Sequence, residues 1–245
     1  MVIDKTYKIS AFGYFGDIIP TSENVMFFLE AFKQDGLIPS LIQEFNVTEV
    51  IPGAKTVPNN RIALMSNDGQ TQIIIGTNRI DYSFSIPNDQ RIVQNELVSL
   101  VNQKIVHFYE VVFAKFKKSS TRLALNTESL LVNLSNEEIE NLMLKYRNPI
   151  SIYSESLVEW NTHLMIRKTS EVLKDEVLNV ITNISKAVIN KAVNGETQLS
   201  DGFIIQTDIN TLAENSNPRF DKDALIAFIN ESNFLWSLII TEIGC

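Results

Sequence analysis

The sequence predicts an α+β protein in which one unit, made of a strand, a helix, several strands and a long helix, is used twice in tandem. The predicted elements start again near residue 119, and each half ends in a long amphipathic stretch. The 245 residues are 44% hydrophobic and include only 9 glycines and 7 prolines, so a packed core is expected rather than disorder. We expect the halves, residues 1–118 and 119–245, to pack together as one globular body.

The first half opens with a strand and a helix. Residues 5–15 alternate between polar and β-forming side chains, which is typical of a half-buried strand. Thr21 or Ser22 caps the next helix, which runs to about residue 35 with apolar side chains at three- and four-residue spacing. Gly36 ends this helix.

Several strands and a long helix complete the first half. Residues 40–48 and 79–86 are predicted strands, and residues 61–66 and 71–77 flank an Asp-Gly turn, which is a strong hairpin signal. From residue 89 to 117 the apolar positions take the helical period and form one wide stripe. The sequence therefore predicts strands followed by a core helix.

The second half repeats this order. Residues 121–134 are extended, and Ser135 and Glu138 form a capping box at the start of a short helix. The strands predicted next are residues 157–169, 177–193 and 203–209, and residues 221–244 form the final helix.

Such a β-α-β-β-β(β)-α unit buries its apolar surface in one way. Its strands form an antiparallel sheet and both helices cover the same face. Two units joined side by side give a continuous curved sheet, similar to the arrangement of TATA-binding-protein-like folds. This analogy concerns the fold alone and carries no function.

The charge of the chain disfavours nucleic acid as a partner. With 21 Lys and Arg against 29 Asp and Glu, the formal net charge is −8, which opposes binding to a phosphate backbone. The densest basic cluster, Lys115, Lys117, Lys118 and Arg122, is interpreted as cations at a helix C-terminus.

The expected location is the cytoplasm, without a membrane span. No apolar run approaches the ~20 residues needed to cross a bilayer, and the N-terminus lacks the features of a secretory signal. The single cysteine, Cys245, excludes an internal disulfide and a cysteine-based metal cluster.

No motif predicts a catalytic residue, a metal or a cofactor. His107 and His163 lack a second histidine at ligand spacing, so structural roles are expected for both. The segment from Gly13 to Gly16 lacks the lysine and hydroxyl residue of a phosphate loop, and Asp17 after it would repel phosphate. An enzyme is therefore the less favoured class.

One polar cluster is the candidate ligand site. Asp208 ends an otherwise apolar strand, where it is expected to pair with Arg122 on a neighbouring strand or to contact a ligand. Together with Asn126, these residues would form the polar lining of a pocket between the halves.

Two segments carry a family resemblance. Residues 120–126, Ser-Thr-Arg-Leu-Ala-Leu-Asn, and 202–210, Gly-Phe-Ile-Ile-Gln-Thr-Asp-Ile-Asn, resemble an uncharacterised, sporadically distributed bacterial protein family. Leu125 stands where that family has an aromatic residue, and Asn210 replaces its second acid. The resemblance implies the fold and no activity.

Three functions remain as hypotheses. The leading one is a non-enzymatic binding or accessory protein of a bacterial multi-gene system, phage defence being one example, that contacts a protein partner encoded nearby. The first alternative is a small-molecule sensor or enzyme that uses the pocket between the halves. The second is a nucleic-acid-binding or DNA-mimic protein, and a homo-oligomer is compatible with each.

Overall fold

The computed structural model describes residues 2–45, 58–87, 94–146, 159–193 and 196–244. Its nine strands form one antiparallel sheet in the order β2-β3-β4-β5-β1-β6-β9-β8-β7. The strands are β1 Val2–Phe12, β2 Leu37–Glu44, β3 Asn59–Ser66, β4 Thr71–Ile75, β5 Arg79–Ser85, β6 Arg122–Leu131, β7 Asn161–Thr169, β8 Val177–Val193 and β9 Glu196–Thr211. The α+β class and the antiparallel sheet predicted from the sequence are confirmed.

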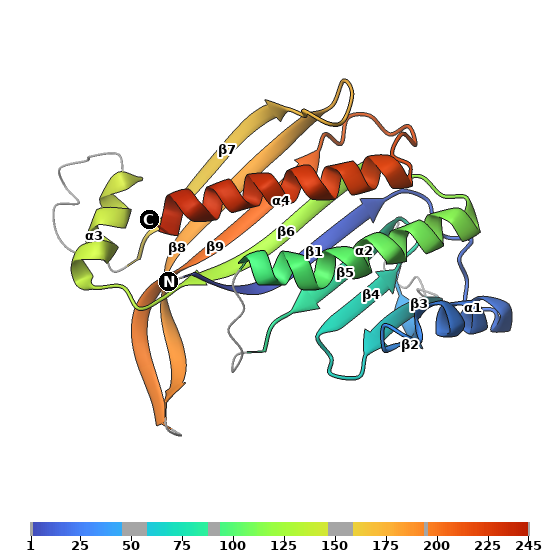
Figure 1. Cartoon of the computed structure of the whole chain (residues 1–245), viewed down its shortest axis with the longest axis horizontal. Helices are drawn as coiled ribbons and strands as arrows, with labels where there is room; N and C mark the ends of the chain where they lie inside the picture. Colours follow the sequence, from blue (N-terminus) through green and yellow to red (C-terminus); the bar gives the residue numbers. More distant parts are fainter. Residues whose placement is uncertain (1, 46–57, 88–93, 147–158, 194–195, 245) are drawn as a thin grey trace, which may run out of the picture.

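Two long helices cover one face of the sheet. The described helices are α1 Ser22–Phe32, α2 Gln94–Phe116, α3 Asn136–Lys145 and α4 Lys222–Gly244. Helices α2 and α4 lie side by side over the central strands β1 and β6 (Figure 1). Helix α1 joins this layer, because Phe28 stacks on Phe116 and Phe32 contacts Phe108 of α2. Among the described helices, none covers the other face of the central strands, which is called the open face below (Figure 1).

Tyrosine side chains tie the helices to the sheet. Tyr7 of β1 is fully buried, its ring lies 5.7 Å from that of Trp236, and its hydroxyl donates to Asn233 Oδ1 at 2.8 Å. Tyr109 of α2 donates to the carbonyl oxygens of Ile9 and Ile80 at 3.1 and 3.2 Å. Burial raises the pKa of both hydroxyls well above the ordinary value, so they stay neutral donors.

A buried arginine fixes the loop that follows β1. Arg61 of β3 is 2% exposed and donates to the carbonyl oxygens of Phe15, Gly16, Ile75 and Gly76. The Glu44 carboxylate lies 3.7 Å from its Nε. One guanidinium therefore holds two chain segments at the same end of the sheet, since its fork of donors can reach several acceptors at once.

The outer strands extend beyond their neighbours. β9 pairs with β6 only from Phe203 to Asn210, and β8 pairs with β7 only from Val177 to Ser185. The remaining residues of β8 and β9 pair with each other alone and project as a two-stranded arm (Figure 1). Gly202 lies where the arm leaves the sheet, and a Cβ there would approach the carbonyl oxygen of Leu131 to 2.6 Å.

Several local predictions are confirmed. The side chain of Thr21 accepts from the amide of Asn24 at the start of α1, and Ser135 and Glu138 form the expected capping box. Gly69 has a positive φ of 71° in the turn between β3 and β4. Residues 46–48, 89–93 and 157–158 of the predicted elements, and Cys245, lie outside the described residues.

Helix α4 bears on the expectation that no segment crosses a membrane. By length and composition alone, its 23 residues are apolar enough to do so. Here the helix packs on the sheet, with Leu225, Phe228 and Trp236 fully buried. The core accounts for part of this apolar surface, whereas Phe234 and Leu238 of the same helix are 59% and 46% exposed. The cytoplasmic location stays a prediction.

Candidate functional site

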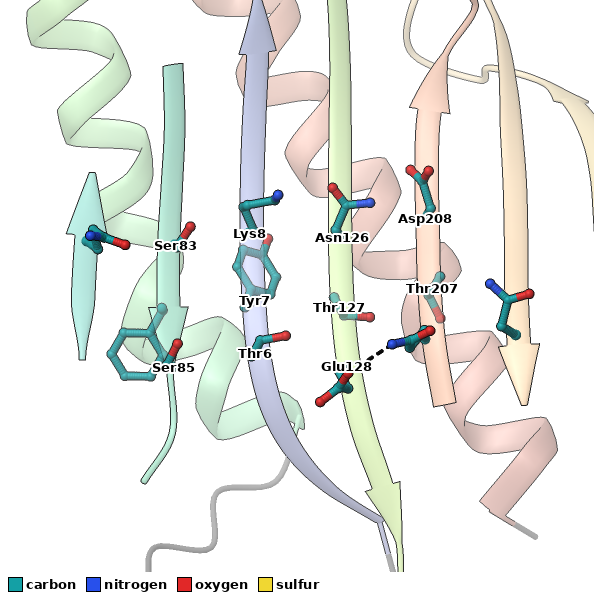
Figure 2. A pocket seen from close by; sticks show the side chains of 14 residues that line it. Thr6, Tyr7, Lys8, Ser83, Ser85, Asn126, Thr127, Glu128, Thr207 and Asp208 are labelled. Carbon is teal, nitrogen blue, oxygen red and sulfur yellow. Dashed lines mark hydrogen bonds between the residues drawn. The ribbon is translucent and has the colours of Figure 1, made fainter. Parts of the chain in front are cut away.

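A polar hollow of about 540 Å³ lies on the open face of the sheet, around the seam between β1 and β6. Figure 2 shows its lining, which comes from both sides of that seam. Most of these side chains are hydroxyls, carboxamides or charged groups, and Phe84 is the one wholly apolar member. The hollow therefore offers hydrogen-bonding groups beside a comparable extent of apolar surface.

Strand register places the central side chains of the hollow in one row. Ser83 of β5 faces Lys8 of β1, Lys8 faces Asn126 of β6, and Asn126 faces Asp208 of β9. Neighbouring strands lie about 4.8 Å apart, so the row from Ser83 to Asp208 spans about 14 Å. Figure 2 shows Lys8, Asn126 and Asp208 side by side at the same height.

The structure brings together two of the three predicted site residues. Asn126 and Asp208 are direct cross-strand partners in the hollow. Arg122 lies four residues along β6 from Asn126, which corresponds to about 13 Å, and it is not part of the lining.

The expected ion pair between Arg122 and Asp208 does not form, because the register separates the two side chains. The Arg122 guanidinium lies 5.0 Å from the centre of the Phe12 ring. Asp208 Oδ1 instead accepts from the side chain of Asn210 at 3.0 Å.

The hollow holds one ammonium and two carboxylates. Lys8 is partly buried, and its side chain forms no hydrogen bond or ion pair with another described residue. Glu128, two residues from Asn126 on β6, accepts from Gln206 of β9 at 3.0 Å. Of these three charged groups, Lys8 is the one without a hydrogen-bond partner among the described residues.

Sequence reasoning missed Lys8, Ser83 and Glu128. The alternation of the first strand places Lys8 on the face opposite Tyr7, but the identity of its neighbours depends on how distant strands pair. No local pattern carries that information.

Two of the four cations in the basic cluster near the end of α2 lie beside carboxylates. Lys115 lies 3.6 Å from Glu23, and Lys118 lies 2.6 Å from Asp17. These two pairs weaken the positive charge that a nucleic-acid interface needs in a basic stripe.

The histidines lie apart from each other. His107 on α2 is 4.0 Å from Asp35, and His163 Nδ1 on β7 is 2.6 Å from Asn183 Oδ1. Within the described ranges, no group of three or more potential metal-ligating side chains occurs.

A second surface is the outer edge of β7. This strand ends the sheet and carries Leu164, Met165 and Ile166, which are 42%, 48% and 60% exposed. The amide of Lys186 donates to the Trp160 carbonyl, and the amide of Ser170 donates to the Glu176 carbonyl, both at 2.9 Å.

Those two bonds show which residues of β7 hydrogen-bond to β8. In an antiparallel pair, alternate residues turn their N–H and C=O groups toward the partner strand. The even-numbered residues of β7 therefore bond to β8, and the odd-numbered ones direct theirs outward. The outward set is Asn161, His163, Met165, Arg167 and Thr169.

The turn behind β7 is anchored to the helix layer. Glu231 of α4 is 8% exposed and accepts from the amide of Glu171 at 2.8 Å and from the Ser170 hydroxyl. A carboxylate that caps a turn in this way restricts its motion. The edge strand is thus held in place at its C-terminal end.

The opposite edge of the sheet differs. Strand β2 contains Pro39, which has no N–H to offer, and it is contacted by α1. Proline on an edge strand is a common protection against pairing with another chain. Of the two edges, β7 is the better one for adding a strand.

Comparison of this chain with protein-family models, with curated proteins and with solved structures found no match. The resemblance to a bacterial family therefore stays a prediction.

Proposed function

We propose that this protein is an accessory protein that binds an extended segment of a partner protein along strand β7. The observation that carries the proposal is an edge with no described strand beyond it and with outward N–H and C=O groups on alternate residues from Asn161 to Thr169. Partner segments that add a strand to an exposed sheet edge gain affinity from main-chain hydrogen bonds and specificity from alternate side chains.

The apolar centre of β7 supports this proposal. Leu164 and Ile166 point to the helix-covered side and Met165 to the open side, so an added strand would find apolar neighbours on both faces. Each of these side chains is about half exposed, and covering it would contribute about 1 kcal/mol. Each new main-chain hydrogen bond would add about 1 kcal/mol.

The test is a matched pair of variants at Met165. Met165→Pro removes one outward N–H and leaves the bonds to β8 in place, whereas Met165→Ala keeps the N–H and shortens the side chain. Capture of interacting proteins from cells that encode this chain should fail with Met165→Pro and persist, though weakened, with Met165→Ala. Both variants should keep the wild-type Tm to within a few degrees.

A second pair of variants places a charged side chain on each edge strand of the sheet. Ile166→Lys should also abolish capture, whereas Leu41→Lys on β2, which is 63% exposed, should leave it unchanged. If Met165→Pro and Ile166→Lys still capture a partner at the wild-type level, the proposal is contradicted. A concentration-dependent dimer that Met165→Pro abolishes would assign the edge to a second copy of this chain instead of a separate partner.

A ligand site in the hollow is the second candidate function. Its support is the pairing of Asn126 with Asp208 beside the unpaired Lys8. The two proposals use different faces and can be tested separately.

We also propose that the chain is a tandem of two related units, similar in arrangement to TATA-binding-protein-like folds. The sheet order supports this, because β5-β1 and β9-β6 occupy equivalent places about the seam and α2 and α4 cover the same face (Figure 1). In an experimental structure, residues 1–118 should superpose on residues 119–245 by a two-fold rotation about the β1–β6 seam. A rotation axis elsewhere would refute the duplication.

A further inference from the structure

The hollow presents opposite charges at a fixed spacing across the strands. Lys8 on β1 and Asp208 on β9 are separated by one strand, β6, which places Asn126 between them. Two strand spacings correspond to about 10 Å. A ligand that lies across the strands therefore meets a cation, a carboxamide and an anion in that order.

Two of these groups have unused hydrogen-bonding capacity. The Lys8 ammonium and the Asn126 carboxamide are partly buried, and neither bonds to another described side chain or main-chain group. An ammonium offers three donors, and a carboxamide both donates and accepts. A partly desolvated ammonium without a partner favours an anionic group above it.

The charge balance restricts the class of ligand. Glu128 and Asp208 would repel a polyanion such as a nucleotide, since Lys8 is the one cation among the described residues of the lining. An apolar ligand would leave the carboxamides and hydroxyls of the hollow unpaired, which is costly. A dipolar ligand, with one anionic and one cationic end, satisfies both conditions.

We infer that the hollow binds a short peptide with free termini, with its carboxylate at Lys8, its ammonium at Asp208 and a peptide group at Asn126. An extended residue spans about 3.3–3.6 Å, so the ends of a tripeptide lie about 10 Å apart and match the separation of the two charges. This inference is independent of the β7 edge, which lies at the end of the sheet.

Titration calorimetry with triglycine tests the inference, with N-acetyl-triglycine and triglycine amide as the capped probes. Triglycine should bind, and removing either terminal charge should weaken binding by about tenfold or more, as expected for the loss of one charge-assisted hydrogen bond. No heat of binding at about 10 mM triglycine, or equal binding of the capped peptides, would overturn the assignment.

Variants then test the orientation. Lys8→Met should bind triglycine and triglycine amide equally well, and it should still bind triglycine more tightly than N-acetyl-triglycine. Asp208→Asn should bind triglycine and N-acetyl-triglycine equally well, and it should still bind triglycine more tightly than triglycine amide. Lys33→Met is the matched control, because Lys33 is an exposed lysine at the end of α1 and its loss changes the net charge equally. Both hollow residues lie on the open face, so the melting temperature should not change. If both variants rank the three peptides as the wild type does, the hollow is not the peptide site.

Discussion

Asp4 makes the stability of this protein depend on pH in an unusual direction. Its carboxyl is 1% exposed at the seam between β1 and β6, where Oδ1 accepts from the Ser129 hydroxyl at 2.7 Å. Oδ2 has no hydrogen-bond partner in the part of the chain that the structure describes. Burial outweighs the Ser129 hydrogen bond and raises the pKa of Asp4 from the ordinary 3.8 to about 6.

The sign of the effect follows from linkage. Because the folded-state pKa is the higher one, the unfolded chain releases this proton first as the pH rises. The contribution of Asp4 to the free energy of unfolding is fully present below pH 3.8 and is lost as the pH rises through about 6. The shift corresponds to about 3 kcal/mol in total, and roughly half of it develops between pH 5 and pH 8.

Asp4→Asn should remove this penalty. An asparagine keeps an acceptor for Ser129 and cannot ionise, so the variant should be more stable than the wild type at pH 8, by up to about 3 kcal/mol. Urea unfolding of both proteins at pH 5 and pH 8 measures the difference, which should grow by about 1.5 kcal/mol between the two pH values. A variant less stable than the wild type at pH 8, or a difference independent of pH, would refute the reasoning.

The other predictions concern the ties that hold the sheet and its edges. Arg61→Met should lower the free energy of unfolding by about 3–5 kcal/mol, because Glu44 and the surrounding carbonyl groups lose their donor. Chemical denaturation measures this loss, and a loss below about 1 kcal/mol would show that water replaces the guanidinium. Gly202→Ala should destabilise by about 1–3 kcal/mol, since its methyl group would meet the backbone of Leu131; an unchanged Tm would contradict this contact. Glu231→Gln should speed amide exchange in the turn between β7 and β8 by about tenfold and leave the rest of the sheet unchanged, which hydrogen-exchange mass spectrometry can resolve.

Local features of this fold follow from the sequence because short-range interactions decide them. The Thr21 cap, the capping box that begins at Ser135 and the turn at Gly69 each depend on residues within four positions of one another. The alternation and helical period of the apolar residues likewise predict the α+β class. These signals need no knowledge of distant strands.

The candidate site depends on pairings that no local signal contains. Lys8 meets Asn126 from the other half of the chain, and Asn126 meets Asp208 from the end of β9. Asn126 and Asp208 were expected in one polar lining together with Arg122, and the strand register does place the first two side by side. Arg122 was wrongly expected to pair with Asp208, since a separation of four residues along β6 moves a side chain by about 13 Å.

Strand ends were also harder to predict than strand centres. Residues 203–209 were the predicted strand, whereas β9 runs from Glu196 to Thr211. Its first part is rich in polar residues and contains Gly202, so it has a weak strand signal and is held by pairing with β8.

Amide hydrogen exchange along β7 tests the proposed function most directly. In the free protein, the amides of Leu164 and Ile166, which bond to β8, should exchange slowly, and those of Met165 and Arg167, which point outward, should exchange fast. On addition of the captured partner, the outward amides should become as protected as their neighbours. If the partner binds and the amides of Met165 and Arg167 still exchange at the free rate, strand addition at this edge is contradicted.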